Sequence, residues 1–211
     1  MKDIKGNLGW VAAGAIAIVL VASGFQGGAE KSGVIDMNRL ITDSNMGKKN
    51  TDVLKDAIKR RETLLSFLAA NPVAKEEEAN RLKVLALKDA LTEPEKKEEE
   101  QTKANIQAAV KDFNDRNTKQ NPTDEDRNML AEYNRRRQAT SRLIGQWQEE
   151  FQMQLNDIQN QVRTAETTKA REALNEVAKK GGFTIVFESQ IAPYGANDLT
   201  DEAIKTLNAK P

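Results

Sequence analysis

The chain has 211 residues, 30% of them charged and 5% aromatic, and its formal net charge is zero. This composition offers little material for one large core and suits long helices that bury a narrow apolar stripe. The absence of net charge argues against a nucleic-acid partner. Cysteine and histidine are both absent, which excludes thiol chemistry, disulfides, Cys/His zinc sites and a histidine general base. Carboxylates and lysines remain, but no catalytic or nucleotide-binding motif is built on them, so we expect neither an enzyme nor a cofactor.

The N-terminus has the layout of an export signal. Lys2 and Lys5 precede an apolar run over residues 8–25, and small residues follow. This order is typical of a secretory signal peptide, with cleavage after Ser23 or Ala29. About 18 apolar residues also reach the lower limit for spanning a bilayer. Residues 1–29 are therefore predicted to be a cleaved signal or an uncleaved anchor, and in both cases the remainder works outside the cytoplasm.

Two short apolar runs at opposite ends of the remaining chain predict a pair of strands. Residues 32–37 ("SGVIDM") are brief and β-branched, and residues 183–187 ("FTIVF") follow Gly181 and Gly182. A lone strand leaves its backbone hydrogen-bonding groups without partners, so we expect the two runs to pair. Everything between them is then an excursion that leaves the strands and returns.

That excursion is predicted to be helical, with breaks at its prolines. Apolar residues recur at spacings of three and four over residues 53–68, and Asn71-Pro72 interrupts the pattern. Leu82 and Leu85 mark a short second helix. Thr92 is the expected N-cap of a third helix, because acidic residues fill its first turn. After a break at Asn121-Pro122, Thr123 with Asp126 forms a variant of the capping box.

A long helix is then expected over residues 124–180, with Gly181 as its stop. At about 1.5 Å per residue it exceeds what a compact globule needs. Its apolar stripe has nearly coiled-coil spacing and consists of Leu143, Trp147, Phe151, Leu155, Ile158 and Val162. A last short helix, capped by Asp198 or Thr200, has three residues on its inner face, Ala203, Ile204 and Leu207.

These elements predict a mainly α protein with a small β part, of the α+β class. A helical, coiled-coil-like arm over residues 47–180 is expected to project from a small β-containing base over residues 30–46 and 181–211. On the arm, Leu143, Trp147, Phe151 and Leu155 are candidates for packing or for contact with a bound chain. Packing is the preferred interpretation of the Trp147 and Phe151 pair. Arg135, Arg136 and Arg137 either contact an acidic or phosphate-bearing partner or form a solvated face, and the solvated face is preferred.

Both ends of the predicted base resemble one known family. "SGVIDMNRLITDSNMGKKN" near the start is similar to the opening of the Skp/OmpH family of periplasmic chaperones. "ALNEVAKKGGFTIVFESQIAPYGANDLTDEAIKTLN" is similar to the family's ending, with a strand, a turn that carries tyrosine and a closing helix. Each motif alone is weak, but their order and separation, together with the export signal, are specific.

The resemblance implies a homotrimer in which strands from both chain ends build a small shared β-barrel, with arms enclosing a cavity. It implies an ATP-independent holdase that keeps unfolded outer-membrane proteins from aggregating in the periplasm. The residues that it places in the oligomerisation strands are Val34, Ile35, Met37, Ile185, Val186 and Phe187. Residues 8–25, if retained, would attach the trimer to the inner membrane. An exported trimeric coiled-coil protein with a structural or tethering role in the envelope is the alternative.

The sequence also departs from the family pattern. The best-known members are strongly basic, whereas this chain is neutral, which leaves electrostatic capture of acidic surfaces in question. The predicted arm is longer and has more breaks than a simple two-helix hairpin.

Overall fold

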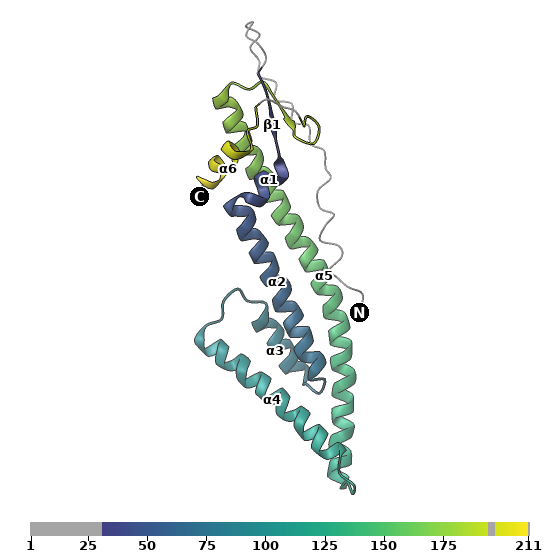
Figure 1. The fold of residues 1–211 in the computed structure, drawn as a ribbon. Coiled ribbons are helices and arrows are strands. Elements are labelled where there is room, and N and C mark those ends of the chain that lie inside the picture. The colour runs from purple at the N-terminus through teal and green to yellow at the C-terminus, as the bar shows by residue number, and fades with distance from the viewer. Residues whose placement is uncertain (1–30, 194–196, 211) are drawn as a thin grey trace. The chain divides into compact units, whose positions relative to one another are not determined.

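The computed structural model describes residues 31–193 and 197–210. The predicted signal or anchor over residues 1–29 lies outside the described residues, as does Tyr194 of the predicted C-terminal turn. Within the described part, long helices accompany a small two-stranded sheet, which confirms the predicted fold class (Figure 1). The elements in chain order are β1 (Ser32–Ile35), α1 (Met37–Asp43), α2 (Asn45–Ala70), α3 (Glu76–Ala86), α4 (Glu93–Asn117), α5 (Asp124–Gly181), β2 (Ile185–Glu188) and α6 (Thr200–Asn208).

The chain divides into two compact units. Among the described residues, one unit contains residues 31–52 together with those from 160 onward, and the other contains residues 53–159. The first unit therefore holds both strands, α1, α6, the start of α2 and the end of α5. The second holds α3, α4, the rest of α2 and the start of α5.

In the first unit, the two predicted strands pair with each other, as expected. They run parallel, with Ser32 opposite Ile185 and Ile35 opposite Glu188. A parallel pair needs a long crossover connection, and here the whole helical excursion supplies it. On its other side β1 bonds to the segment before α6, since the N–H of Val34 donates to the carbonyl of Asn197 at 2.8 Å.

Both strands differ from their predicted extents, and capping explains each difference. Met37 was expected in the first strand but begins α1, because the carboxylate of Asp36 accepts from the N–H of Arg39 at 2.8 Å and starts the helix. Residues 183 and 184 were expected in the second strand, which begins only at Ile185. Phe183 lies beyond the last residue of α5 but takes part in the hydrogen bonds that end this helix, since its N–H donates to the carbonyl of Ala178 at 2.9 Å.

The end of α5 is a Schellman motif. The N–H of Gly182 donates to the carbonyl of Lys179 at 3.2 Å, which accompanies the bond from Phe183 to Ala178. Gly182 has φ of +69°, a left-handed conformation that glycine adopts without a steric penalty. Gly181, the predicted stop, is the last helical residue, so the glycine that turns the chain is the next one.

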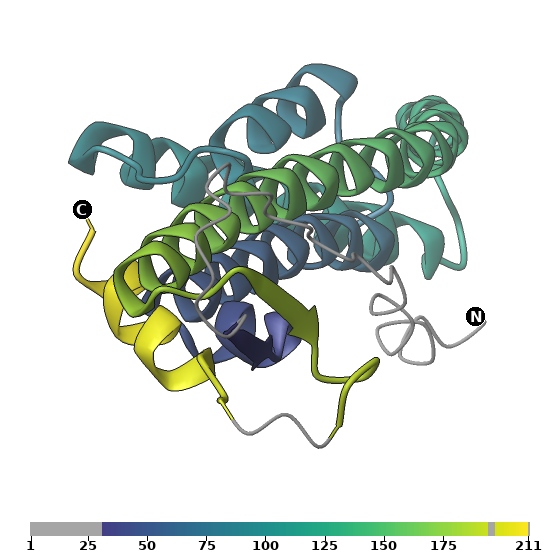
Figure 2. The same cartoon turned by 90° about the horizontal axis from the view of Figure 1, so that it is seen from above.

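The core of the first unit surrounds the last turns of α5. Figure 2 shows α6, α1 and the strands around this end of the helix. Ala203 and Leu207 of α6 are buried there and Ile204 is half-buried, as their predicted inner face requires. The cluster consists of Ile35, Leu40, Ala170, Ala173, Leu174, Val177, Ala178, Val186, Leu199, Ala203 and Leu207.

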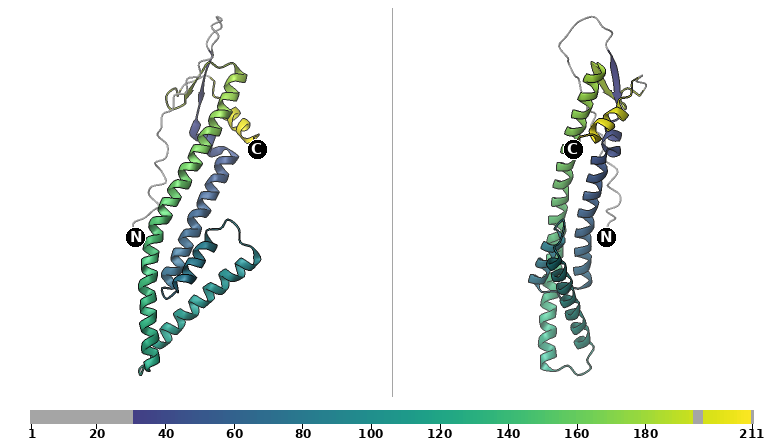
Figure 3. Two further views of the ribbon diagram at one scale, coloured as in Figure 1. Left: turned by 180° about the vertical axis from the view of Figure 1, so that it is seen from behind. Right: turned by 90° about the vertical axis from the view of Figure 1, so that its left-hand side faces the viewer.

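The second unit has a core of its own. Figure 3 shows α4 leading from the connection after α3 to the turn before α5. The breaks at Asn71-Pro72 and Asn121-Pro122 are confirmed, since α2 ends at Ala70 and α5 begins at Asp124. The core cluster consists of Leu64, Leu68, Ala74, Ala79, Leu82, Ile106, Trp147 and Phe151.

The predicted helix starts in the second unit are confirmed by their hydrogen bonds. The N–H of Thr92 donates to the carboxylate of Glu95 at 2.9 Å. Thr123 and Asp126 bond reciprocally, with the Thr123 N–H donating to the Asp126 carboxylate and the Asp126 N–H donating to the Thr123 hydroxyl, at 3.0 and 3.1 Å.

Candidate functional site

The outer edge of β2 is the first candidate interaction surface. Among the described residues β2 pairs only with β1. The N–H of Thr184 faces β1, where it donates to the carbonyl of Lys31 at 2.9 Å. Within the strand the alternation is set by Ser189, whose N–H donates to the carbonyl of Ile35 at 2.7 Å, and by the register that pairs Ile35 with Glu188. Because successive residues of a parallel strand point their main-chain groups to opposite sides, those of Ile185 and Phe187 face β1, whereas the main-chain groups of Val186 and the N–H of Glu188 face away from it. This edge offers unpaired donors and acceptors to another strand.

The predicted oligomerisation residues divide into two groups. Val34, Ile35 and Val186 are buried in the first unit. Ile185 is half-buried, and Phe187 is 38% exposed. Ile191 was not among the predicted residues; it is 52% exposed and lies three positions after the end of β2. Its position, as an apolar residue just before the predicted turn, was the feature of the sequence from which its exposure could have been predicted. Exposed apolar side chains beside an open strand edge favour association with another chain.

The predicted arm residues have different surroundings. Trp147 and Phe151 are buried in the core of the second unit, with ring centroids 6.3 Å apart, and Leu143 is half-buried against the same core. Leu155 is half-buried and outside both described clusters. In this conformation neither ring of the Trp147 and Phe151 pair is open to a partner.

Two cations lie against these rings. The Nζ atom of Lys83 lies 5.0 Å from the Trp147 ring centroid and is 2.5 Å from a carboxylate oxygen of Glu150. The guanidinium of Arg61 lies 5.4 Å from the Phe151 centroid, and burial lowers the pKa of Arg61 below its ordinary value. Such cation–π contacts stabilise the core and position the helices that supply the cations.

A groove in the second unit, of about 500 Å³, is the second candidate surface. Its side chains come from α2, α3, α4 and the connection between α3 and α4. Leu64, Leu82 and Leu85 are buried, and Phe67 is half-buried. The remaining lining residues are Lys59, Arg60, Thr63, Ala86, Lys88, Asp89, Leu91, Glu99, Lys103 and Gln107.

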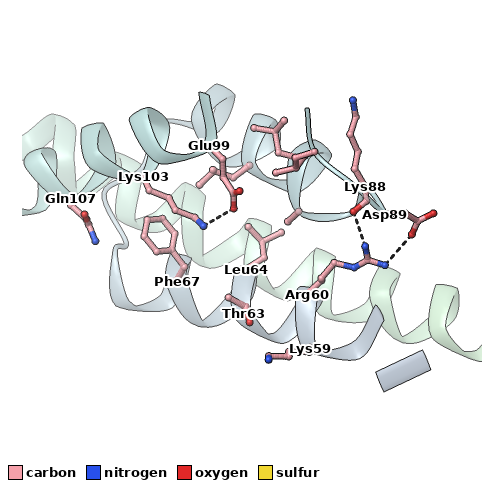
Figure 4. A pocket seen from close by; sticks show the side chains of 14 residues that line it. Lys59, Arg60, Thr63, Leu64, Phe67, Lys88, Asp89, Glu99, Lys103 and Gln107 are labelled. Carbon is pink, nitrogen blue, oxygen red and sulfur yellow. Dashed lines mark hydrogen bonds and ion pairs between the residues drawn. The ribbon is translucent and has the colours of Figure 1, made fainter. Parts of the chain in front are cut away.

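Ion pairs stand at both ends of this groove (Figure 4). At one end the guanidinium of Arg60 donates to the carbonyl of Lys88 at 2.7 Å and to the carboxylate of Asp89 at 3.1 Å. Toward the other end, Lys103 pairs with Glu99 at 2.5 Å, next to Phe67. The groove thus offers apolar surface between charged ends.

Helices α3 and α4 follow the first proline break and belong to the second unit. The sequence predicted this region as a long arm with several breaks. A comparison with protein families matches residues 31–207 to the family described as "Outer membrane protein (OmpH-like)". The chain belongs to this OmpH-like family. The match confirms the resemblance seen at the two ends, and it extends through all the helices between them.

Membership in the OmpH-like family indicates a chaperone-like role toward outer-membrane proteins in general, in a family that is periplasmic. Comparison with curated proteins and with solved structures found no match.

Among the described residues, no helix is both long enough and apolar enough to cross a membrane, and residues 8–25 lie outside that range. Within the same residues, no cluster of three or more acidic side chains could hold a metal ion.

Proposed function

We propose that this OmpH-like protein is an ATP-independent holdase. It binds unfolded outer-membrane proteins in the periplasm and prevents their aggregation. The family match, which covers nearly every described residue, carries this proposal. Binding without catalysis also agrees with the surfaces, which present apolar side chains and backbone edges.

The proposed active form is a homotrimer. Residues 30–46 and 181–211 form its base, and residues 47–180 form its arms. The outward-facing main chain of Val186 and N–H of Glu188 support this, because a two-stranded sheet is marginal alone and adding strands from other copies pairs its edges. The exposed side chains of Phe187 and Ile191 would be covered in such an assembly.

Clients would contact the arms through many weak interactions. The groove that contains Leu64, Phe67 and Leu85 supports this, since an apolar side chain of an unfolded chain would be removed from water there. Export through residues 1–29 would place the trimer in the periplasm, either released by cleavage or attached to the inner membrane through residues 8–25.

The first experiment measures the solution mass of the protein by light scattering, alone and with an unfolded β-barrel membrane protein. A trimer that takes up the client and keeps it in solution is the expected result. A stable monomer would contradict the shared-sheet architecture. A trimer that leaves the client to aggregate would contradict the holdase function.

The second candidate function is a structural tether of the cell envelope. The apolar run over residues 8–25 favours it, since a retained anchor would fix the arms to a membrane. The mass of the N-terminal peptide from protein purified out of its native envelope distinguishes the two. Retention of residues 8–25 together with inactivity on clients would support tethering.

A further inference from the structure

The three successive arginines of α5 have different partners. Both Arg135 and Arg136 bind Glu132, through Nε atoms that lie 3.1 and 3.0 Å from its two carboxylate oxygens. The guanidinium of Arg136 also lies 5.2 Å from the ring centroid of Tyr133. Arg137 differs, because no carboxylate of the described residues pairs with it. Its guanidinium lies 5.5 Å from the ring centroid of Phe113 on α4.

Arg137 lines a second hollow of the second unit, of about 380 Å³. Its apolar lining comes from α2, from the turn before α3 and from α4, and consists of Ala70, Pro72, Val73, Val110 and Phe113. The rest of the lining is polar and consists of Asn114, Asn117, Asn134 and Arg137. The α4 residues are three and four positions apart, so they share one face of its last turns. Asn134 and Arg137 are one turn apart on α5.

The asparagines of this hollow, Asn114, Asn117 and Asn134, have no side-chain hydrogen-bond partner among the described residues, and Arg137 contacts only a ring there. Two carboxylates close to them in sequence are engaged elsewhere. Glu132 binds the other two arginines, and Asp112 accepts from Arg116 at 2.8 Å and from the Tyr133 hydroxyl at 2.9 Å. The cation of Arg137 and three amides therefore face the hollow with free donors and acceptors.

We propose that this hollow is a binding site for a carboxylate of a polypeptide, with a neighbouring apolar side chain against Val110 and Phe113. The planar guanidinium offers two parallel N–H donors that match a carboxylate, and stacking on Phe113 holds it in place. Each asparagine amide supplies both donors and acceptors, which suits the main chain of a bound peptide.

The charges of the hollow favour a singly charged group over a phosphate. Arg137 is the single basic side chain among its lining residues. Asn114 and Asn117 belong to the last turns of α4, where the helix dipole is negative and opposes an anion. One guanidinium neutralises a carboxylate, whereas a doubly charged phosphate would keep one charge without a partner beside the negative end of α4.

This site goes beyond the proposed holdase function. A holdase grips clients through many weak contacts, whereas Arg137 and the asparagines form one discrete, saturable site. Peptide binding here can be measured whether or not the protein suppresses aggregation, so the two proposals fail independently.

Titration calorimetry on the full chain tests the proposal with three short Gly/Ser peptides. The first ends in Val-Leu with a free carboxylate, the second has the same sequence with an amidated end, and the third is amidated but contains an internal Glu beside Val. We expect saturable binding of the first or third peptide, and binding of the second weaker by about tenfold or more. Binding of the first alone assigns the site to chain ends, and binding of both assigns it to carboxylates in general.

Variants locate the site. Arg137→Gln should weaken the bound peptide by about tenfold. Arg135→Gln is the matched control, since Arg135 lies two positions before Arg137 on another face of α5 and does not line the hollow. It should leave affinity within about twofold, because its charge is engaged with Glu132. Circular dichroism and thermal unfolding check that both variants fold. If Arg137→Gln does not fold, Asn134→Ala is the second substitution in the hollow. Four results would each overturn the proposal. Two concern the peptides: the fully amidated peptide without Glu binds as well as the others, or no peptide binds. The other two are equal losses of affinity in both arginine variants, and competition by inorganic phosphate that is as strong as competition by acetate.

Discussion

The carboxylate of Glu188, the last residue of β2, accepts a hydrogen bond from the backbone N–H of Met37, the first residue of α1, at 3.3 Å. This contact joins the two ends of the chain, since 151 positions separate the residues. Its negative charge lies at a helix N-terminus, where the dipole favours it. Burial nevertheless raises the pKa of Glu188 above its ordinary value, so desolvation outweighs the bond.

The pH dependence of Glu188 follows from that raised pKa. The folded protein holds the proton more tightly than the unfolded chain, so the free energy of unfolding should increase as pH falls through the folded pKa toward the ordinary glutamate value, and should level off below it. Glu188→Gln keeps an acceptor without the charge, so it should be at least as stable as the wild type at pH 7 and lose that advantage in acid. Urea unfolding at several pH values measures this.

Glu188→Ala is the matched variant, because it removes the acceptor altogether. It should cost about 1 kcal/mol in acid, where Glu188 is protonated, which is typical for the loss of a helix cap. The cost should be smaller at pH 7, because the variant also removes the desolvated charge. If Glu188→Gln were clearly less stable than the wild type at pH 7, the charge itself would be stabilising and the desolvation argument would be wrong.

Gly47 lies where α1 and α2 meet, and the junction leaves no room for a side chain. A Cβ atom there would be 2.0 Å from the carbonyl oxygen of Ile41, while the Gly47 N–H donates to the Ser44 hydroxyl at 3.0 Å. Gly47→Ala should therefore lower the free energy of unfolding by roughly 1–3 kcal/mol, as overpacking does. Gly145→Ala in α5, where a Cβ meets no atom within 4 Å, should raise it by about 0.5–1 kcal/mol. A neutral Gly47→Ala would show that the junction shifts at little cost.

Asp126 connects the end of α4 with the start of α5. Its side chain is 2% exposed and accepts from Arg116 at 2.7 Å and Lys119 at 2.8 Å. The bond from Lys119, together with those from the N–H and hydroxyl of Thr123, holds the pKa of Asp126 well below the usual range. The resulting stabilisation is present above the ordinary aspartate pKa and should be lost as pH falls below about 4. Asp126→Asn should speed amide exchange around this turn at pH 7, and the difference from the wild type should shrink in acid.

Asp124→Asn is the control for Asp126, because it changes a neighbouring carboxylate that is 92% exposed and pairs with Arg127 alone. Amide exchange near the turn should be unaffected by it, as exposed ion pairs contribute little. Equal effects of the two variants would mean that the buried network does not hold the turn.

Trp147 allows packing to be separated from client contact. Trp147→Ala should cost about 3–5 kcal/mol, since the ring is 4% exposed in the core of the second unit. Met153→Ala on the same helix should change stability by less than about 0.5 kcal/mol, because Met153 is 62% exposed. In a Trp10→Phe background, Trp147 emission reports this site alone and should not respond to a client. A shift on client addition, with stability intact in Trp147→Ala, would identify a contact residue.

Features that depend on local chemistry could be predicted from the order of the residues. Prolines at 72 and 122 ended helices, Thr92 and Thr123 began them, and a β-branched run after two glycines formed a strand. The apolar ends of the chain also contained enough of the family pattern to indicate their pairing. These features were predictable because each depends on residues within a few positions of one another.

Features that depend on residues far apart in the chain could not be predicted and became clear from the folded structure. The parallel direction of β1 and β2 follows from how the whole excursion returns, and Met37 left its predicted strand for a helix that Glu188 helps to cap. Nothing in the sequence assigned different partners to Arg135, Arg136 and Arg137. Their different partners arise because α4 places Phe113 beneath Arg137, and no local pattern records which helix packs against a given face.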